Sequence, residues 1–443
     1  MFSRFNTYNR NTRHTKLKQM AKPKLALIPC TQGYFLNSVL PSDGSGDFRF
    51  GRSGKATRIN SQGLIEEVDD GQSRLNYPMI DGKVVGCPHH ILEGARTNLI
   101  TYSEDFSDAS WVKSDLTVNS NQITSPSGNL TADLLIEGVS NSEHNIRFNA
   151  YVSSNTYTYS VFVKKYNGSS DRNVSFKIGG TNGVGTFNLD TGIWTGVTFD
   201  NPNAIDFGND WWLLSFTDTG PSFNVIIQIN NNGNVSYQGD GTSGIYIWGA
   251  MLEQGSFPTS YIKSNGSAVT RSAETATGSG DAATFNDSEG VLMAEISALA
   301  DDLSNRGIAI SDGSVNNRVT MFYTNVSNAI QVKVVVGGSN SLNSYIAISN
   351  ISLHNKFALK YKQNDFSLFV NGFELITDTS GNTFSNGTLT ELAFDRGDGA
   401  EDFYGNTKQI QYYNSALTDS ELEQLTSWTS FTDMAQGQLY TIE

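Results

Sequence analysis

Apolar and polar residues alternate over short stretches of this chain, above all from about residue 112 onward. Tyr157, Tyr159 and Val161 alternate with smaller or polar residues, and residues 174–178 and 330–336 repeat the pattern. A period of two places every second side chain on the same face of a strand. The pattern therefore predicts many short, half-buried β-strands.

Turn sequences separate these stretches. Asp-Thr-Gly stands at 190–192 between two predicted strands, and Asn-Gly pairs stand at 232–233 and 371–372. Asn-Gly suits the two-residue turns of β-hairpins, in which both central residues have positive φ. Residues 245–252 are almost all apolar, which predicts a central strand covered on both faces.

The stretch from Asp402 to Leu425 predicts a last strand followed by one short helix. Ile410 and Tyr412 belong to the strand. Thr418 and Glu421 have the spacing of a capping box, in which each side chain accepts a hydrogen bond from a backbone N–H at the helix start. Leu417 and Leu422 stand at the two positions of a hydrophobic staple across the same cap.

Composition agrees with an all-β chain of two or three domains. The chain has 443 residues, of which 17% are charged and 11% aromatic, with 42 glycines. Its net charge of −14 argues against general nucleic-acid binding. No apolar run is long enough for a transmembrane helix, so no membrane insertion is expected. The N-terminus lacks the apolar segment of a secretory signal.

Positive charge is concentrated at the N-terminus. Residues 1–24 contain seven Lys or Arg and no acidic residue. The favoured interpretation is a flexible or non-native leader, because Met20 is itself a candidate start. The alternative is a basic arm that docks on an acidic partner. Cys30 and Cys87 are the only cysteines; free thiols are favoured, and one disulfide is the alternative.

The C-terminal part resembles the concanavalin A-like (laminin-G-like) domains. In that family a strand leads through a sequence such as Tyr413-Asn414-Ser415-Ala416-Leu417 into a short helix. Residues 357–373, FALKYKQNDFSLFVNGF, are similar to two paired strands of the same fold. The resemblance implies a jelly roll over residues 289–443. It does not imply one function, since the fold hosts lectins, glycanases and structural modules.

A second resemblance covers residues 55–111. The sequences ATRINSQGLIE at 56–66 and ILEGARTNLI at 91–100 resemble an N-terminal block found in tailed-bacteriophage virion proteins. In such proteins a jelly roll similar to carbohydrate-binding modules commonly follows, here over residues 112–263. The resemblance implies a virion protein, and it implies no reaction.

These observations give one organisation. We expect an all-β chain of tandem antiparallel β-sandwich or jelly-roll domains with an irregular N-terminal attachment region. The segments are a basic arm at 1–24, the attachment region at 25–111, a carbohydrate-binding-module-like jelly roll at 112–263, a Ser/Gly-rich linker at 264–288 and a concanavalin A-like domain with a C-terminal tail at 289–443.

Acid/base chemistry has weak support in the sequence. Glycanases of the concanavalin-like fold carry acidic residues as E-x-D-x-x-E on one strand, and Ser297 interrupts the nearest equivalent at 295–297. The acidic cluster at 66–70 is interpreted as a solvated loop. No His spacing typical of a metal site appears. No enzymatic activity is therefore expected.

Binding residues are easier to nominate. Tryptophan faces beside polar groups can stack on sugars, and the candidates are Trp194, Trp211, Trp212 and Trp248. Adjacent residues of a strand point to opposite faces, so one of Trp211 and Trp212 is expected to face outward. Core packing is the favoured outcome for most of these rings.

A second candidate is an acidic loop. Residues 394–402 have the oxygen-rich composition that Ca²⁺ requires, and the candidate ligands are Asp395, Asp398, Glu401 and Asp402. The EF-hand spacing is absent, and a solvated loop is the favoured alternative. No other cofactor is expected.

The sequence thus favours a non-enzymatic phage structural protein, either a head or tail fibre or a decoration protein on the particle surface. Its N-terminal region would bind other virion proteins, its domains would face host glycans or neighbouring subunits, and the resemblance implies a homotrimer. The alternatives are a polysaccharide depolymerase and a secreted bacterial lectin or adhesin.

Overall fold

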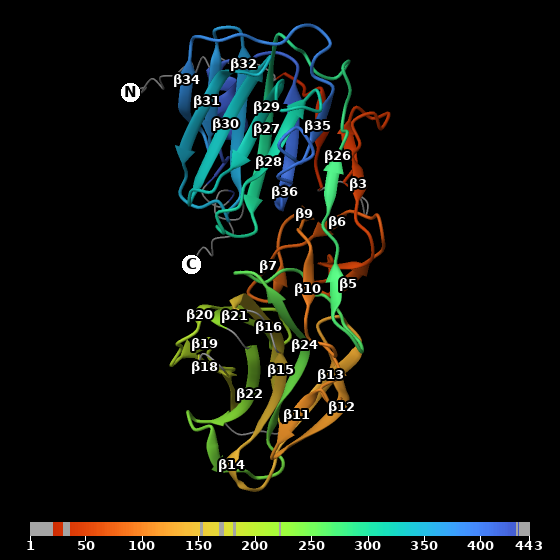
Figure 1. The fold of residues 1–443 in the computed structure, drawn as a ribbon, viewed down its shortest axis with the longest axis vertical. Coiled ribbons are helices and arrows are strands. Elements are labelled where there is room, and N and C mark those ends of the chain that lie inside the picture. Colours follow the sequence, from red (N-terminus) through yellow and green to blue (C-terminus); the bar gives the residue numbers. More distant parts are fainter. Residues whose placement is uncertain are drawn as a thin grey trace, which may run out of the picture.

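The computed structural model describes residues 21–29, 36–150, 154–167, 172–179, 183–220, 223–430 and 433. Two β-sandwiches lie along the long axis of an elongated molecule, with short strands of the N-terminal region between them (Figure 1). The predicted fold class, all-β with tandem antiparallel sandwiches, is confirmed.

The first sandwich is built from residues 111–254 and has two facing antiparallel sheets. The β11 sheet contains, in spatial order, β11 (Trp111–Ser114), β15 (Asn145–Ala150), β22 (Phe223–Asn231), β17 (Arg172–Gly179), β18 (Val184–Asn188) and β19 (Ile193–Thr195). The β24 sheet contains β12 (Leu116–Thr124), β13 (Leu130–Glu137), β24 (Gly244–Gln254), β16 (Asn155–Lys165), β21 (Trp211–Gly220) and β20 (Asp200–Asp206). A short ribbon, β14 (Asn141–Glu143) with β23 (Ser236–Gln238), closes one end.

The core of this sandwich follows the predicted alternation. Tyr159, Val161 and Val163 point inward from β16, while Phe162 of the same strand belongs to a second cluster on the outer face of the β24 sheet. β24 is buried on both faces, as its apolar sequence predicted. Burial on the outer face requires a cover, and the N-terminal region supplies it through Ile59 and Ile65.

The second sandwich also has two sheets. The β36 sheet runs β2 (Ser38–Leu40), β1 (Leu25–Leu27), β36 (Gly405–Tyr413), β27 (Glu289–Ala298), β32 (Asn355–Lys362), β33 (Phe366–Val370) and β34 (Phe373–Asp378), with β9 (His89–Leu92) and β6 (Arg74–Asn76) attached beside β36. The β30 sheet runs β31 (Ser339–Ala347), β30 (Ala329–Val336), β29 (Arg318–Tyr323), β28 (Arg306–Ser311) and β35 (Glu391–Ala393).

The closing segment of the chain folds as its sequence predicted. The helix α1 (Asp419–Thr426) has Thr418 as its N-cap, with both hydrogen bonds of the capping box to Glu421 present. Leu417 and Leu422 are buried in one cluster on the outer face of the β36 sheet. The Asn371-Gly372 hairpin is present as well, with φ of 50° and 88°.

The N-terminal region differs from a separate attachment module. β1 and β9 pair with opposite halves of β36, so these two strands, with β2 and β6 beside them, complete the sheet of the second sandwich. The remaining strands are two-stranded ribbons: β4 (Ala56–Ile59) with β5 (Ile65–Val68), β7 (Met79–Ile80) with β8 (Lys83–Val84), β3 (Arg49–Gly51) with β26 (Thr275–Thr277), and β10 (Arg96–Asn98) with β25 (Val269–Arg271).

The Ser/Gly-rich segment 264–288 is also ordered, although its composition suggested a flexible linker. β25 and β26 pair with β10 and β3, and Arg271 and Glu274 between them are buried. The segment crosses from one sandwich to the other as part of a packed junction (Figure 1). Cys87 takes part in a disulfide, whereas the sequence favoured free thiols; Cys30 and the arm up to residue 20 lie outside the described residues.

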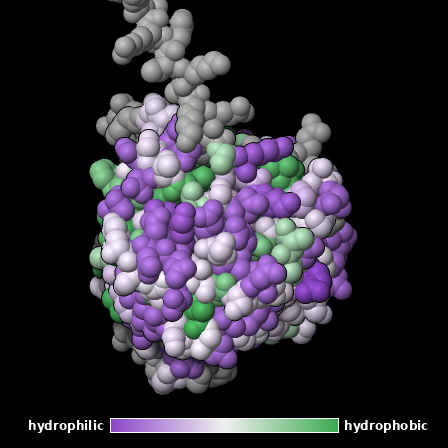
Figure 2. Space-filling model, turned by 90° about the horizontal axis from the view of Figure 1, so that it is seen from above, coloured by the Kyte–Doolittle hydropathy of each residue, from purple (hydrophilic) through white to green (hydrophobic). Residues whose placement is uncertain are grey.

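Among the described helices, none is long and apolar enough to cross a membrane. The end of the molecule formed by the second sandwich is mostly hydrophilic, with small, separated hydrophobic spots (Figure 2).

Candidate functional site

The four candidate tryptophans are mainly packing residues. Trp211 and Trp248 are 3% and 1% exposed, on the outer face of the β24 sheet under the N-terminal region. Trp212 and Trp194 are partly buried against the core of the first sandwich, and both contact Phe187 edge-on. Trp211 and Trp212 point to opposite faces as predicted. Trp211 and Trp248 expose no stacking face, so these two candidates are corrected to the core packing that the sequence favoured; both lie in the cluster that contains Ile65 and Tyr261.

The predicted calcium ligands do not converge. Asp398 and Glu401 pair with Arg396 at 2.7 and 3.4 Å, and Asp402 accepts a hydrogen bond from the hydroxyl of Tyr404. Asp395 is buried and accepts from the N–H of Gly397. Within the described chain no three acidic, His or Cys side chains are placed to hold a metal ion. The calcium prediction is therefore corrected, because neighbouring groups of the loop satisfy these carboxylates.

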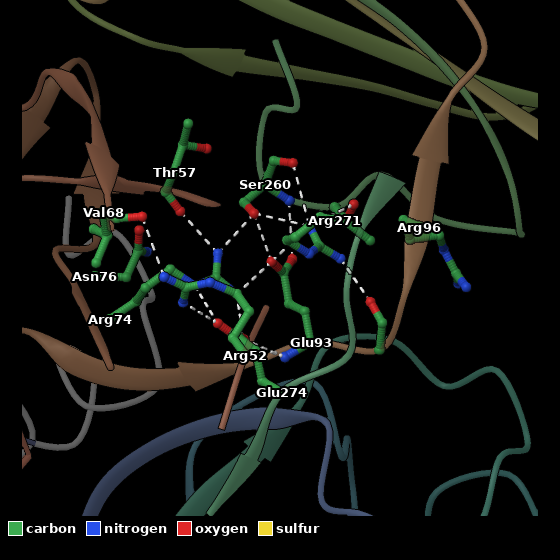
Figure 3. Close-up of polar contacts among 12 residues, drawn as sticks. Arg52, Thr57, Val68, Arg74, Asn76, Glu93, Arg96, Ser260, Arg271 and Glu274 are labelled. Atoms are coloured by element: carbon green, nitrogen blue, oxygen red, sulfur yellow. Dashed lines mark hydrogen bonds and ion pairs between the residues drawn. The ribbon is translucent and has the colours of Figure 1, made fainter. Parts of the chain in front are cut away.

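A cluster of buried charges lies where the two sandwiches meet (Figure 3). Arg74 is fully buried; its Nε donates to Glu274 Oε1 at 2.8 Å, and its Nη2 donates to Glu93 Oε2 at 2.8 Å. Arg52 donates to the same Glu274 oxygen at 2.7 Å, and Arg271 pairs with Glu93 at 2.9 Å. We call Arg52, Arg74, Arg271, Glu93 and Glu274 the junction cluster.

Backbone and hydroxyl groups satisfy the rest of the junction cluster. Ser260 donates its N–H to Glu93 Oε1 at 2.9 Å, and the N–H of Glu93 donates to Glu274 at 2.9 Å. Arg74 Nη1 donates to the carbonyl of Thr57 at 2.8 Å. Buried ions are costly unless they are paired and their remaining donors are satisfied. Every ion of the cluster is paired, and among the cluster's side-chain atoms only Nε of Arg271 is buried without a hydrogen-bond partner. The members come from four separate stretches of the chain.

Charge pairing decides how these groups ionise. Burial would raise the pKa of Glu93, but Arg271 and Arg74 outweigh it and lower that pKa to about 2. Burial would lower the pKa of Arg74, yet Glu274 and Glu93 raise it. Nearby Glu253 has its pKa raised to about 7, because burial outweighs its hydrogen bonds from Thr259. Glu93 and Arg74 therefore stay ionised at neutral pH.

Residues of the 55–111 block build part of this junction. Glu93 of the EGARTN sequence is a member of the junction cluster. Arg96 of the same sequence pairs with Glu253 at 3.6 Å. Asn98 is fully buried; its amide nitrogen donates to the carbonyls of Ala250 and Ile262, and its oxygen accepts from Leu252 at 3.1 Å. The motif thus joins the block to the first sandwich.

A cleft of about 780 Å³ opens between the N-terminal region and the outer face of the β24 sheet. One wall is the β7–β8 hairpin with residues 61–64, and the other comes from the β12–β13 hairpin. Between them three adjacent strands bring Tyr246, Lys164 and Trp211 into register on one face. The cleft reaches Lys83 on the hairpin and Leu130, whose side chain is 62% exposed.

Two glycines hold the hairpin wall in place. Asp81 and Gly82 have φ of 46° and 68°, the positive pair that a tight hairpin turn needs. Gly82 lies directly on Gly208, so a Cβ on Gly208 would be 2.5 Å from the carbonyl oxygen of Gly82. The backbone contact fixes the hairpin on the first sandwich and sets the width of the cleft.

Sequence reasoning missed both sites. The junction cluster unites residues about 180 to 220 positions apart, such as Glu93 with Glu274 and Arg52 with Glu274. No local pattern reports pairing at such separations. One signal was present: charged residues in otherwise apolar or small-residue segments, as at 93 and 271–274, are candidates for buried pairs.

No protein-family model matches the sequence, and neither does any curated protein. Solved structures with partial similarity include the CBM40 module of the Ruminococcus gnavus IT-sialidase bound to α2,3-sialyllactose, at 18% identity and a TM-score of 0.27 over 32% of this chain and 84% of that one. The SAP-like pentraxin of Limulus polyphemus matches at 14% identity and a TM-score of 0.26, over 32% of this chain and 71% of that one. The leech intramolecular trans-sialidase matches at 20% identity and a TM-score of 0.26, over 33% of this chain and 24% of that one. Similarity at this level assigns neither fold nor function. The fold is established by the strand pairing within the chain itself.

Proposed function

We propose that this chain is a non-enzymatic structural component of a tailed-bacteriophage particle, a head or tail fibre or a decoration protein. The observation that carries the proposal is the place of the phage-like block. Residues 55–111 lie between the two sandwiches, and Glu93, Arg96 and Asn98 connect them through buried contacts. A block that fixes two β-sandwiches in one line suits a display scaffold.

The geometry favours attachment through the second sandwich. The described chain begins at residue 21 against this domain, where Ala21 packs beside the α1 cluster and the N–H of Lys24 donates to the carbonyl of Tyr412. A basic arm preceding this point would contact the particle there, and other virion proteins would be its partners. The first sandwich would then face outward, toward host-surface glycans or neighbouring subunits. A homotrimer is part of the same proposal.

Purified particles test the proposal. Virions washed at high salt and banded in a density gradient should retain the chain in a fixed copy number relative to the major capsid protein. Quantitative mass spectrometry of the gradient fractions makes the measurement. Absence of the chain from banded particles, with recovery in the soluble lysate, would end the proposal.

A matched pair of particles locates the attachment. A phage that encodes the chain without residues 1–19 should incorporate it poorly, while one with Lys55→Gln, an exposed change far along the chain, should incorporate it normally. Equal incorporation of both would exclude the basic arm as the attachment element.

A further inference from the structure

We infer that the cleft between the β7–β8 hairpin and the β24 sheet binds an acidic oligosaccharide. The inference deepens the proposed function, because it names the surface of the outward-facing sandwich that would meet a glycan. It is independent of the four tryptophans nominated from the sequence, of which only Trp211 borders the cleft.

Size and lining suit a short sugar chain. Ligand sites in proteins commonly enclose roughly 300 to 1,000 Å³, and the cleft of about 780 Å³ falls within that range. Four exposed amide side chains line it: Gln62, Gln122, Asn167 and Asn209. An amide both donates and accepts hydrogen bonds, which matches the paired capacity of sugar hydroxyls.

Apolar surface is available beside these amides. Tyr246 is half-buried in the floor of the cleft, and its ring meets that of Tyr166 edge-on at 5.4 Å, which fixes its orientation. Leu130 on the opposite wall is 62% exposed. A few oriented polar groups around a fixed aromatic face are the arrangement by which proteins position a partly apolar, partly polar ligand.

The positive charge of the residues that line the cleft favours an acidic ligand. Lys83 and Lys164 line the cleft, and of the described residues that line it none is Asp or Glu. This is unusual on a chain of net charge −14. Lys164 lies 3.5 Å from Asp210, whose side chain is 83% exposed and screened by solvent, and its ammonium also donates to the carbonyl of Asn209. Two ammonium groups in a concave site attract a carboxylate or a phosphate.

The cleft is built before the ligand arrives. The Gly82–Gly208 contact fixes one wall, and the N–H of Ile65 donates to the carbonyl of Pro126 at 3.0 Å, which joins the other. A site with fixed walls loses less conformational entropy on binding.

Calorimetry on the full chain tests the inference with three probes. The probes are hexagalacturonate, which carries carboxylates, maltohexaose phosphate, which carries a phosphate, and neutral maltohexaose. At least one acidic probe should bind, and raising the salt to 0.5 M should weaken binding. Which of the two binds identifies the anionic group. Binding of neither, or equal binding of maltohexaose, overturns the inference.

Three variants locate the site. Lys83→Gln should weaken acidic-probe binding about tenfold or more, the effect of losing one charge-assisted hydrogen bond. Gln122→Trp should abolish binding by filling the cleft. Lys55→Gln removes the same charge from an exposed position in the same region but outside the cleft, and binding should stay within about twofold.

Equal losses in Lys83→Gln and Lys55→Gln would show general attraction and overturn the site, as would full binding by Gln122→Trp. Circular dichroism spectra of the three variants confirm that each is folded. Incorporation into particles is measured separately, so loss of glycan binding leaves the proposed structural role standing, and failure of incorporation leaves the cleft standing.

Discussion

Single residues of the junction cluster contribute more to the stability of the fold than residues of exposed ion pairs do. Arg52 meets Glu274 at 2.7 Å with both side chains fully buried, and Lys55 meets Glu67 at the same distance with side chains 61% and 46% exposed. Solvent screens the second pair, whereas removing one partner of the first leaves an unpaired ion in the interior. The two pairs have the same N···O distance and differ strongly in burial, which makes them a useful comparison.

Glu274→Gln should lower the free energy of unfolding by about 3 to 5 kcal/mol, because Arg52 and Arg74 lose their shared carboxylate. Glu67→Gln should change it by less than about 1 kcal/mol. Urea titrations followed by tryptophan fluorescence make the measurement. Equal effects of the two substitutions would contradict the structural importance of the cluster.

Buried histidines predict a pH dependence. Burial lowers the pKa of His90 to about 3, with a further contribution from Arg74. In the unfolded chain a histidine takes up its proton near pH 6.5, while native His90 does not until about pH 3. The unfolded state therefore binds the extra proton across this window, and stability should fall as the pH decreases from about 6.5 to 3.

Replacing this group should flatten the dependence. His90 lies edge-on to Phe50 and Phe394, so His90→Phe fits an aromatic setting. The variant should lose less stability than the parent chain between pH 6.5 and 4 in denaturant titrations. Parallel curves for the two proteins would show that His90 does not contribute.

Elements whose signals are local were predictable, and those covered by distant segments were not. The capping box and staple of α1 involve residues three to five positions apart, and both are present. Trp211 and Trp248 lie on strands whose outer face could equally have met solvent. Their burial depends on Ile59 and Ile65, which no pattern around residues 211 or 248 reports.

The β7–β8 hairpin supports a prediction about an element. Gly208→Ala should destabilise the chain by more than Gly54→Ala, because the new Cβ would meet the Gly82 carbonyl, while Gly54 has a similar φ of 83° and open space around it. Backbone strain alone costs about 1 to 2 kcal/mol. Hydrogen exchange should show faster opening of residues 79–84 only in Gly208→Ala. Unchanged exchange would mean that the contact does not hold the hairpin.

At the scale of the whole molecule, the all-β class with tandem antiparallel sandwiches followed from the sequence, and the connection between the sandwiches did not. Composition suggested a flexible segment at 264–288, since Ser, Gly and Thr dominate it. In the structure Arg271 and Glu274 bind partners near residues 52–93, and the flanking strands pair on both sides. Nonlocal ion pairs override the local preference of a polar segment.

A protease should therefore spare this segment. Limited digestion of the native chain with a nonspecific protease should leave residues 264–288 intact, although a segment of this composition in a flexible linker is cut readily. Glu274→Gln should make it cleavable, because the contact that holds the crossing is lost. Mass spectrometry of the fragments locates the cuts. Rapid cleavage of the parent chain within 264–288 would contradict a rigid junction.

Strand β36 has a consequence for synthesis on the ribosome. Its partners β1 and β9 are made first, yet Leu25 pairs with Tyr412 and Leu92 with Gly405, close to the other end of the chain. The backbone groups of β1 and β9 that pair with β36 therefore stay unpaired until the end of the chain is made. The first sandwich, whose strands are contiguous in sequence, can fold before that. Strand pairing between segments so far apart in sequence forms slowly, and until it forms the unpaired strand edges are prone to aggregation. Producing the chain in full length should therefore depend more on chaperones than producing residues 98–263, which keep the first sandwich with its buried Ile100, Phe106 and Trp111.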